Sequence, residues 1–324
     1  MLKSSLKIVL PFLLLIGLFL IWHNRWWFYD EYRLYGYKPP AEISQIASED
    51  QLTNYAKTLL YVYRPDLENS TEFNTNCRVT TVAIVLGCTV IDRGIYLYNI
   101  QDPTLNGVEQ VTAAYEMLHV AYSRLSTSEL NSVNAMVVSA YNKLSVNNPQ
   151  LRAEYASYLK TEGPAAIDNE MHSTLGTEIS NLPPALAKYY QKYFINRQVI
   201  VNYANSYESV FTSRQNEVIS DDQQLSSLKA QIDSLNTALT NEYASIESQQ
   251  SNMNSLKANG DYSQYNSDIG PYNSLVNEYN SQEVQDQSLV NQYNSLVAKR
   301  NSIAISEDKL ANEINSLSAT SPAN

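Results

Sequence analysis

AAYEMLHVAY, residues 113–122, combines a helical pattern of apolar residues with a glutamate and a histidine three positions apart. Tyr115 and His119 are four residues apart, so their side chains share one face of a helix. Glu116 directly follows Tyr115. A histidine at position 115 would complete the motif HExxH, in which two histidines bind zinc and the glutamate is the general base. The spacing of a zinc-binding helix is therefore retained, while one ligand differs.

Segments on the N-terminal side of this helix have the composition of β-strands. TTVAIVLGCTV (80–90) and IYLYNI (95–100) are rich in β-branched and aromatic residues, and DRG (92–94) between them is a turn signal. Together they predict a β-hairpin. KTLLYVYR (57–64) predicts a further strand, preceded by a short helix.

The residues between this hairpin and residue 205 are predicted to be mostly helical. Ser126 and Glu129 form the pattern of a capping box, which marks the start of a helix. Proline is tolerated in the first helical turn, so a helix can begin at a Leu-Pro-Pro sequence. Helices are expected at residues 106–125, 126–144, 150–161 and 166–176, and a last long helix is expected to begin at residues 182–184.

Apolar residues recur with three–four spacing from residue 205 to residue 318. The pattern breaks at ANGDYSQYNSDIGP (258–271) and then resumes. Two heptad segments joined by such a turn predict a long antiparallel coiled-coil hairpin. Polar residues at core positions, Gln282 and Arg300, make its seam weaker than an ideal zipper. The hairpin suits a spacer, self-association or the binding of a protein partner.

A predominantly apolar run, LKIVLPFLLLIGLFLIW (6–22), lies near the N-terminal end. At 1.5 Å per residue it would cover about 25 Å of a hydrocarbon core of about 30 Å. Lys3 and Lys7 precede or begin the run, and Trp26 and Trp27 follow it as interfacial residues. An uncleaved single-pass membrane anchor is expected, with the bulk of the chain extracytoplasmic. A cleaved signal peptide is the alternative.

The net charge limits the possible partners, and the two cysteines support an extracytoplasmic location. The chain has 324 residues and a formal net charge of −11, which argues against nucleic acid as a partner. Cys77 and Cys88 are expected to form a disulfide outside the cytoplasm, with two buried free thiols as the alternative. The absence of CxxC spacing argues against a cysteine metal site.

A second polar cluster, NEMHSTLGTE (169–178), places Glu170, His172 and Glu178 on or beside a helix. VLGC, IYLYNI, TAAYEMLHVAYSRL and EMHSTLGTEISNLPPALAKYYQKYF follow one another in order. This ordered set resembles a poorly characterised group of bacterial membrane-anchored metallopeptidase-like proteins. Their helix typically reads AHEMLHAAY and is followed by ELHSxxGTE and LPxxLExYYxxYFxxR. The resemblance covers roughly residues 53–205.

The resemblance implies a zincin-like domain in which Glu116 is catalytic and His119 binds zinc. Glu170 is the first choice for the third ligand, and Glu178 is the second. His172 is an alternative ligand or a hydrogen-bond donor to the transition state. The fold class expected is α+β and mostly helical, with a small β-hairpin or sheet.

Tyr115 departs from this family pattern at the first zinc ligand. A phenol has a pKa near 10, so neutral tyrosine is a poor zinc ligand unless the metal ionises it. Three hypotheses follow: a degenerate, metal-free peptidase domain with a scaffolding arm; an active zinc peptidase in which Tyr115 or water completes the site; and a structural cell-surface coiled-coil protein whose Glu116 and His119 are ordinary core residues.

The sequence thus divides into five expected regions. They are an anchor at 1–25, a linker at 26–48, a peptidase-like globular domain at 49–204, the coiled-coil hairpin at 205–318 and a disordered tail at 319–324.

Overall fold

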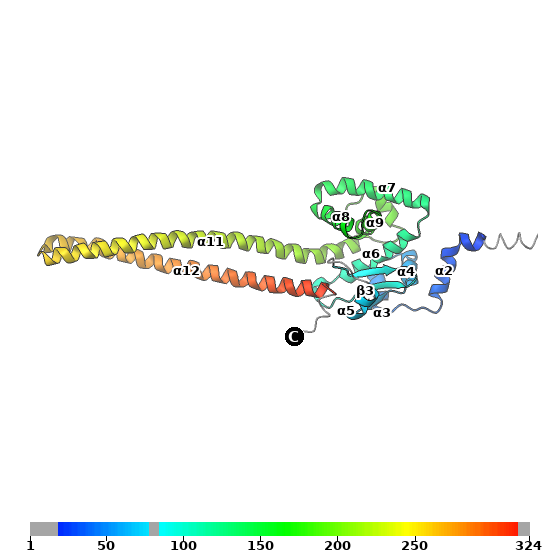
Figure 1. Cartoon of the computed structure of the whole chain (residues 1–324), viewed down its shortest axis with the longest axis horizontal. Helices are drawn as coiled ribbons and strands as arrows, with labels where there is room; N and C mark the ends of the chain where they lie inside the picture. Colours follow the sequence, from blue (N-terminus) through cyan, green and yellow to red (C-terminus); the bar gives the residue numbers. More distant parts are fainter. Residues whose placement is uncertain (1–18, 78–83, 317–324) are drawn as a thin grey trace, which may run out of the picture. The chain divides into compact units, whose positions relative to one another are not determined.

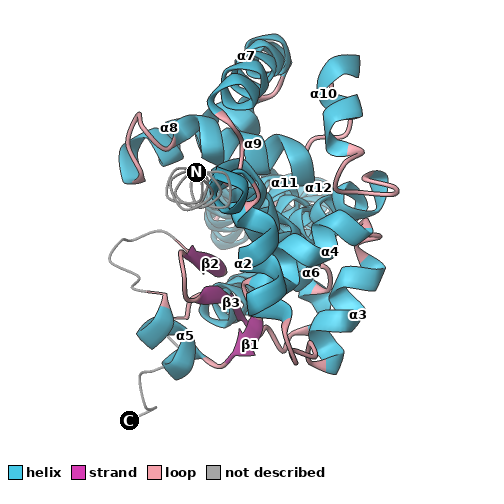
Figure 2. Ribbon diagram, turned by 90° about the vertical axis from the view of Figure 1, so that its right-hand side faces the viewer, coloured by secondary structure: helices cyan, strands magenta, loops and turns pink. Residues whose placement is uncertain are grey.

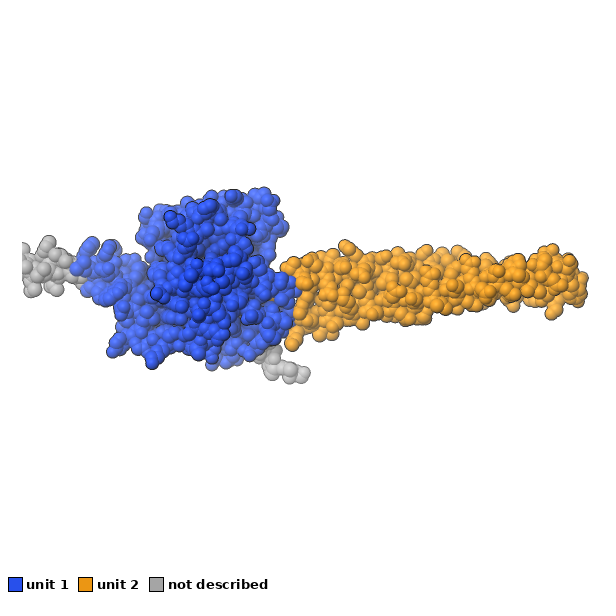
Figure 3. All heavy atoms as spheres, turned by 180° about the vertical axis from the view of Figure 1, so that it is seen from behind, with its two compact units in different colours: residues 1–210, 310–324 blue, residues 211–309 orange. Residues whose placement is uncertain are grey.

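The computed structural model of the chain describes residues 19–77 and 84–316. The chain forms two compact units (Figure 3). Unit 1 comprises residues 1–210 and 310–324, and unit 2 comprises residues 211–309. The tail expected at 319–324 and most of the anchor expected at 1–25 lie outside the described residues. No helix within the described ranges is long and apolar enough to cross a membrane.

Unit 1 is built around helix α6 (Val108–Ser123), which is buried along most of its length. Helix α9 (Ile167–Thr177) packs directly against it, and α3 (Ala41–Glu49) and α4 (Asn54–Val62) contact it as well. The strands β2 and β3 complete its surroundings (Figures 1 and 2). The remaining helices of this unit are α2 (Arg25–Leu34), α5 (Ser70–Asn76), α7 (Thr127–Leu144), α8 (Pro149–Thr161) and α10 (Pro184–Tyr190), with short 3-10 turns at Pro103–Leu105 and Ser145–Asn147.

The sheet has three short strands in the order β1–β3–β2, with β1 at Asp66–Glu68, β2 at Gly87–Val90 and β3 at Gly94–Tyr98. β2 and β3 are antiparallel and pair Thr89 with Ile95, whereas β1 runs parallel to β3. The predicted β-hairpin is therefore confirmed. The predicted disulfide is confirmed too, because Cys77 after α5 is bonded to Cys88 in β2.

The capping box is present at the start of α7. The Ser126 side chain accepts a hydrogen bond from the backbone N–H of Glu129, and the Glu129 carboxylate accepts one from the backbone N–H of Ser126. Both contacts satisfy backbone N–H groups that a helix start leaves without partners. The prediction of a helix start at this point is confirmed.

The strand predicted at residues 57–64 is wrong. Helix α4 continues to Val62, since Ala56, Leu59 and Leu60 recur at helical spacing and are all buried. The chain leaves this helix through Arg64, whose φ is 44°, and β1 begins only after Pro65.

Two other regions also differ from expectation. The residues expected to form a linker, 26–48, contain α2 and most of α3. The helix beginning at Pro184 ends at Tyr190, and Phe194 then forms an antiparallel bridge to Leu52 before α11 begins at Gln198. The packing of Tyr193 and Phe194 into the core explains this interruption.

Helices α11 (Gln198–Ala258) and α12 (Tyr262–Ile314) supply all of unit 2. Lys299 forms salt bridges with Asp221 and Glu217 near one end of the pair, and the rings of Tyr243 and Tyr279 meet nearer the turn. These contacts show an antiparallel helical hairpin formed within one chain. The turn is shorter than the predicted break at 258–271, because α12 begins at Tyr262 and contains Pro271.

The C-terminal end of α12 belongs to unit 1. The Asn74 side-chain amide donates to the Ser316 carbonyl oxygen at 2.8 Å, and the Ser316 hydroxyl donates to Asn74 Oδ1 at 2.8 Å. The backbone N–H of Gln101 donates to the Glu313 carboxylate at 2.8 Å. Unit 2 is thus an insertion between two segments of unit 1.

Candidate functional site

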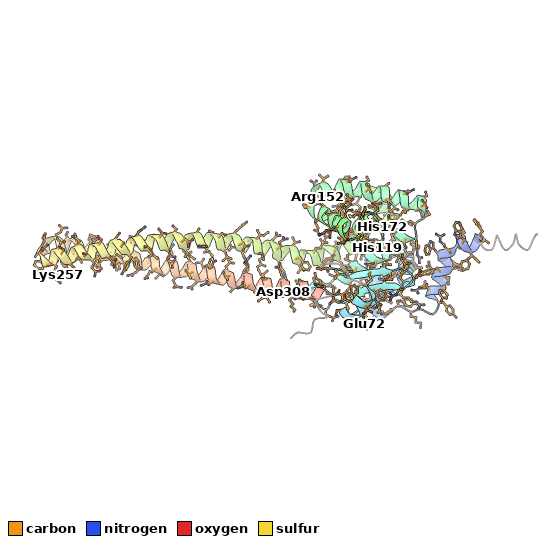
Figure 4. The ribbon with its side chains drawn as sticks, viewed as in Figure 1. Glu72, His119, Arg152, His172, Lys257 and Asp308 are labelled. Carbon is orange, nitrogen blue, oxygen red and sulfur yellow. A yellow bond between two sulfur atoms is a disulfide. The ribbon has the colours of Figure 1, made fainter. Side chains whose placement is uncertain are left out.

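Two helices and one strand bring the candidate residues together. Helix α6 carries Tyr115, Glu116 and His119, and α9 carries Glu170. Tyr115, Glu116 and His119 lie on one side of helix α6, so the helix presents these three polar side chains to a common region. Strand β2 adds Thr89. Figure 4 shows His119, together with His172 of α9.

Two side chains converge on a single carboxylate oxygen of Glu170. Tyr115 Oη donates a hydrogen bond to Glu170 Oε2 at 2.7 Å. His119 Nε2 lies 3.6 Å from the same oxygen. The rings of Tyr115 and His119 meet edge to face, with centroids 4.9 Å apart. The structure therefore brings together Tyr115, His119 and Glu170. The hydrogen-bonded residues Tyr115 and Glu170 are 55 positions apart in sequence.

Tyr115 is a neutral phenol in this environment. Burial raises its pKa well above 10, and the nearby Tyr158 and the carboxylate of Glu170 raise it further. A phenol that keeps its proton can donate it to a carboxylate, as the 2.7 Å contact with Glu170 shows. Tyr115 therefore acts as a hydrogen-bond donor rather than as a tyrosinate.

Glu116 lies beside this group and is only 6% exposed. Its Oε2 accepts a hydrogen bond from Thr89 Oγ1 at 2.8 Å. Burial raises the pKa of Glu116 above 4.5, although His119 and the Thr89 hydrogen bond act in the opposite direction. Gly87 permits this close approach of strand and helix, because a Cβ there would lie 2.5 Å from Thr112 Cγ2 and 3.1 Å from Glu116 Cγ.

Replacing Thr89 with valine is expected to raise the pKa of Glu116 by on the order of one unit, since hydrogen bonds to charged groups contribute about 1.5 kcal/mol or more. The substitution keeps the shape of the side chain but removes the donor that favours the ionised carboxylate. Carboxyl ¹³C titration by NMR measures the change. Thr112→Val is the matched control, because the Thr112 hydroxyl donates to the Val108 carbonyl within α6. Equal pKa shifts in the two variants would contradict the assignment.

His172 has a different environment from His119. It is fully buried, and its Nε2 lies 3.0 Å from Tyr189 Oη. Tyr190 Oη donates to the His172 carbonyl oxygen at 2.6 Å. Burial, with a smaller contribution from His119, lowers the pKa of His172 to about 3. His172 is thus a neutral histidine among tyrosine rings, and its hydrogen bond is made to Tyr189 rather than to Glu170.

Glu178 lies among other acidic side chains, and its charge and that of Glu170 both raise the pKa of Tyr158. It is the C-cap residue of α9, and its electrostatic neighbours are Glu154 of α8 and Glu208 of α11. Burial raises the pKa of Glu178 well above 4.5, and the two neighbouring carboxylates raise it further. The pKa values of Glu154 and Glu208 are raised as well, chiefly by burial.

These raised pKa values predict that unit 1 loses stability as the pH rises above the unfolded-state value of about 4.5. Above that pH the unfolded chain ionises Glu178 while the folded chain still binds its proton, so ionisation favours unfolding. Glu178→Gln is expected to raise the free energy of unfolding at pH 8 by on the order of 1 kcal/mol and to leave it unchanged near pH 4.

Urea unfolding between pH 4 and pH 8 tests this expectation. Tryptophan emission is a suitable signal, because all three tryptophans lie between residues 22 and 27, in unit 1. Glu162→Gln, at the exposed C-cap residue of α8, is the control. A variant that is no more stable than the wild type at pH 8 would rule out the carboxylate cluster as the cause.

Two residues of the site were missed by sequence reasoning. Thr89 of strand β2 donates a hydrogen bond to Glu116, and Tyr158 of α8 raises the pKa of Tyr115. Thr89 follows the glycine of VLGC by two positions, so the period-two alternation of a strand could have indicated that both face the helix. No comparable signal in the sequence marks Tyr158.

The donor atoms present do not fit a tetrahedral zinc ion. Such sites use thiolate, imidazole and carboxylate ligands. Here one imidazole and one carboxylate are accompanied by a neutral phenol whose proton is already hydrogen-bonded to that carboxylate. In the described part of the chain, no three or more His, Cys, Asp and Glu side chains are grouped so that they could hold a metal ion.

No family model, curated protein or solved structure matches this chain.

Proposed function

We propose that this chain is a membrane-anchored, extracytoplasmic relative of the zincin metallopeptidases that has lost zinc-dependent catalysis and acts as a binding or scaffolding protein. The observation that carries this proposal is the 2.7 Å hydrogen bond from Tyr115 Oη to Glu170 Oε2. It joins the position of the first zinc ligand in the family pattern to the position of the third.

The chemistry of this pair supports a metal-free site. Zinc binding would require Glu170 to exchange a short hydrogen bond for a metal bond, while Tyr115 would have to lose a proton whose pKa lies well above 10. Structural zinc sites gain about 10–16 kcal/mol from all their ligands together. Losing one imidazole removes several kcal/mol of that binding free energy, and ionising a buried phenol costs more.

Retained features support the ancestry. Glu116 has the position of the general base, His119 has the position of the second ligand, and Glu170 reaches the same region from α9. The strand β2 of a small hairpin contacts the same helix. An active zinc peptidase with Tyr115 as a ligand remains the alternative function, favoured by the 3.6 Å separation of His119 and Glu170.

The scaffolding role rests on unit 2. Its two helices pair along their length, and few of its side chains are buried. Much of its surface consists of Asn, Ser and Gln, whose short or neutral side chains can form hydrogen bonds with a partner without the desolvation cost of charges. A surface of this kind suits binding to another protein rather than catalysis.

Metal analysis of the purified full-length chain tests the proposal. After incubation with zinc sulfate and dialysis, mass spectrometry is expected to find less than about 0.1 zinc ion per chain, far below the single ion of a catalytic site. A stoichiometric content that disappears in Glu170→Ala would establish the alternative, a zinc enzyme with a tyrosine ligand. The Asp233→Ala variant, altered at an exposed carboxylate of unit 2, controls for adventitious binding.

A further inference from the structure

Helix α2 is attached to unit 1 by one face only. Asp30 forms a salt bridge with Arg124 at 2.8 Å, and the guanidinium of Arg124 lies over the ring of Trp26, 4.8 Å from its centroid. Arg33 Nε donates to the Val62 carbonyl oxygen at 3.0 Å. Positions 26, 30 and 33 share one side of a helix, so these contacts define a docked face.

The opposite face of α2 is aromatic and exposed. Trp27 is 59% exposed and Phe28 is 46% exposed, and the neighbouring Tyr32 and Tyr35 are 80% and 88% exposed. At 100° per residue Phe28 and Tyr32 lie across the helix from Trp26 and Asp30, and Trp27 lies at the border of that face. Tyr35 is the C-cap residue that follows the helix. Exposed aromatic side chains gathered on one helix face mark an interaction surface rather than scattered surface residues.

The sequence and the composition of this face indicate what covers it. The apolar run of residues 6–22 ends just before α2, and its last four residues, Phe19, Leu20, Ile21 and Trp22, are exposed as well. Tryptophan and tyrosine concentrate where hydrocarbon meets the headgroups of a bilayer, because their rings prefer an apolar environment and their polar groups prefer water. A face rich in these residues directly beside an apolar run fits that location.

We propose that the exposed aromatic side chains of α2, Trp27, Phe28 and Tyr32, together with Tyr35 at its C-cap, insert into the interfacial region of a phospholipid bilayer and hold unit 1 against the membrane. This inference rests on the membrane anchoring that forms part of the proposed function, and it is independent of the Tyr115–Glu170 site. The helix acts as a rigid joint, since its other face is bonded to Arg124 and to the Val62 carbonyl oxygen.

The charge of the face selects the type of lipid. It carries one acidic side chain, Glu31, among its aromatic residues and no basic residue between Trp27 and Tyr32. The whole chain has a net charge of −11, which opposes adsorption to anionic lipids. Insertion is therefore driven by apolar and aromatic burial, and zwitterionic phosphatidylcholine suffices.

Two adjacent tryptophans in different environments provide the test, because Trp27 is 59% exposed whereas the ring of Trp26 packs against Arg124. One full-length variant, Trp22→Phe/Trp26→Phe, retains only Trp27, and its partner, Trp22→Phe/Trp27→Phe, retains only Trp26. Both are reconstituted into phosphatidylcholine vesicles with and without brominated acyl chains, which quench nearby indole rings. Flotation establishes that each chain is bound to the vesicles, and far-ultraviolet circular dichroism establishes that each is folded.

Brominated lipid is expected to reduce the emission of Trp27 by about twofold or more, because the ring lies at the hydrocarbon boundary. The emission of Trp26 is expected to change by less than about a fifth, since its ring belongs to the docked face of the helix and packs against Arg124. A further variant, Phe28→Glu/Tyr32→Glu, is expected to abolish the quenching of Trp27 while flotation is retained.

Other results overturn the inference in distinguishable ways. Vesicle-bound chains whose Trp27 is quenched by aqueous acrylamide and not by brominated lipid would place the face in water, while the anchor itself stands. Shielding of Trp27 from both quenchers, together with a doubled molecular mass, would assign the face to a second copy of the chain. Chains that fail to float would refute both the anchor and the insertion, leaving the zinc measurements unaffected.

Discussion

Replacing Tyr115 with histidine is expected to create a zinc site with about one ion per chain, because three protein ligands and a water complete a tetrahedral zinc centre. The substitution removes the donor that is hydrogen-bonded to Glu170 and supplies a second imidazole one helical turn from His119. Histidine is shorter than tyrosine, so space opens beside Glu170 Oε2 where the phenol oxygen lies in the wild type. Under the proposed ancestry, Glu116 has the position of the general base in the family pattern.

The gain is expected to be large in stability as well as in metal content. A ligand that binds only the folded state at about 1,000 times its dissociation constant raises the free energy of unfolding by about 4 kcal/mol. Urea unfolding of Tyr115→His with and without zinc measures this difference. The wild-type chain is expected to show less than about 0.5 kcal/mol under the same conditions, which is the typical limit for surface effects.

Two controls isolate the cause of that gain. Tyr115→Phe removes the hydroxyl without adding a nitrogen, so it should remain unresponsive to zinc. Tyr115→His/Glu170→Ala should lose most of the response, since only the two imidazoles are left as ligands. If Tyr115→His binds no more zinc than Tyr115→Phe, then α6 and α9 do not retain a metal-site geometry, and the zincin ancestry fails.

Gly176→Val is expected to destabilise unit 1 by on the order of 3 kcal/mol or more, because overpacking of a well-filled core typically costs 1–3 kcal/mol and a branched side chain adds further overlap. Even a Cβ at this position would lie 2.4 Å from Leu118 Cδ1 and 2.9 Å from Tyr190 Cε1. Gly176 therefore permits close packing of α9 against Leu118 of α6, the same pair of helices that brings Glu170 to Tyr115.

An opposing effect is too small to change the sign. Glycine in a helix costs about 0.5–1 kcal/mol relative to alanine, so any substitution of Gly176 recovers some of that free energy. Gly270→Ala, in α12, is the matched control, since a Cβ there would meet nothing within 4 Å. Urea unfolding followed by tryptophan emission should detect the loss in Gly176→Val. Gly270→Ala should show no loss, and at most a gain of about 0.5–1 kcal/mol. An unchanged midpoint in Gly176→Val would contradict the packing argument.

Local patterns with strong physical causes were read correctly from the sequence. The turn at residues 92–94 and its flanking β-branched residues predicted the hairpin, and the Ser126–Glu129 spacing predicted a helix start. Heptad spacing predicted the helical hairpin of unit 2. The four-residue spacing of Tyr115 and His119 placed them on one face, and the same helix does bring both to Glu170.

Errors arose where tertiary packing decides between local alternatives. KTLLYVYR has strand-forming residues, yet burial of one helical face of α4 outweighs that propensity. His172 and Glu178 were grouped with Glu170 because they share a segment. A helix turns by about 100° per residue, so neighbours in sequence can face different surroundings, as the tyrosine contacts of His172 show.

The insertion of unit 2 between residues 210 and 310 of unit 1 has a mechanical consequence. Helices α11 and α12 are both covalently continuous with unit 1, and the residues after α12 are held there by the Asn74–Ser316 hydrogen bonds. Tension applied to the turn near Gly260 would divide between α11 and α12, and each helix would carry part of the load along its own axis. An arm fixed in this way resists pulling more strongly than one that hangs from a single peptide link.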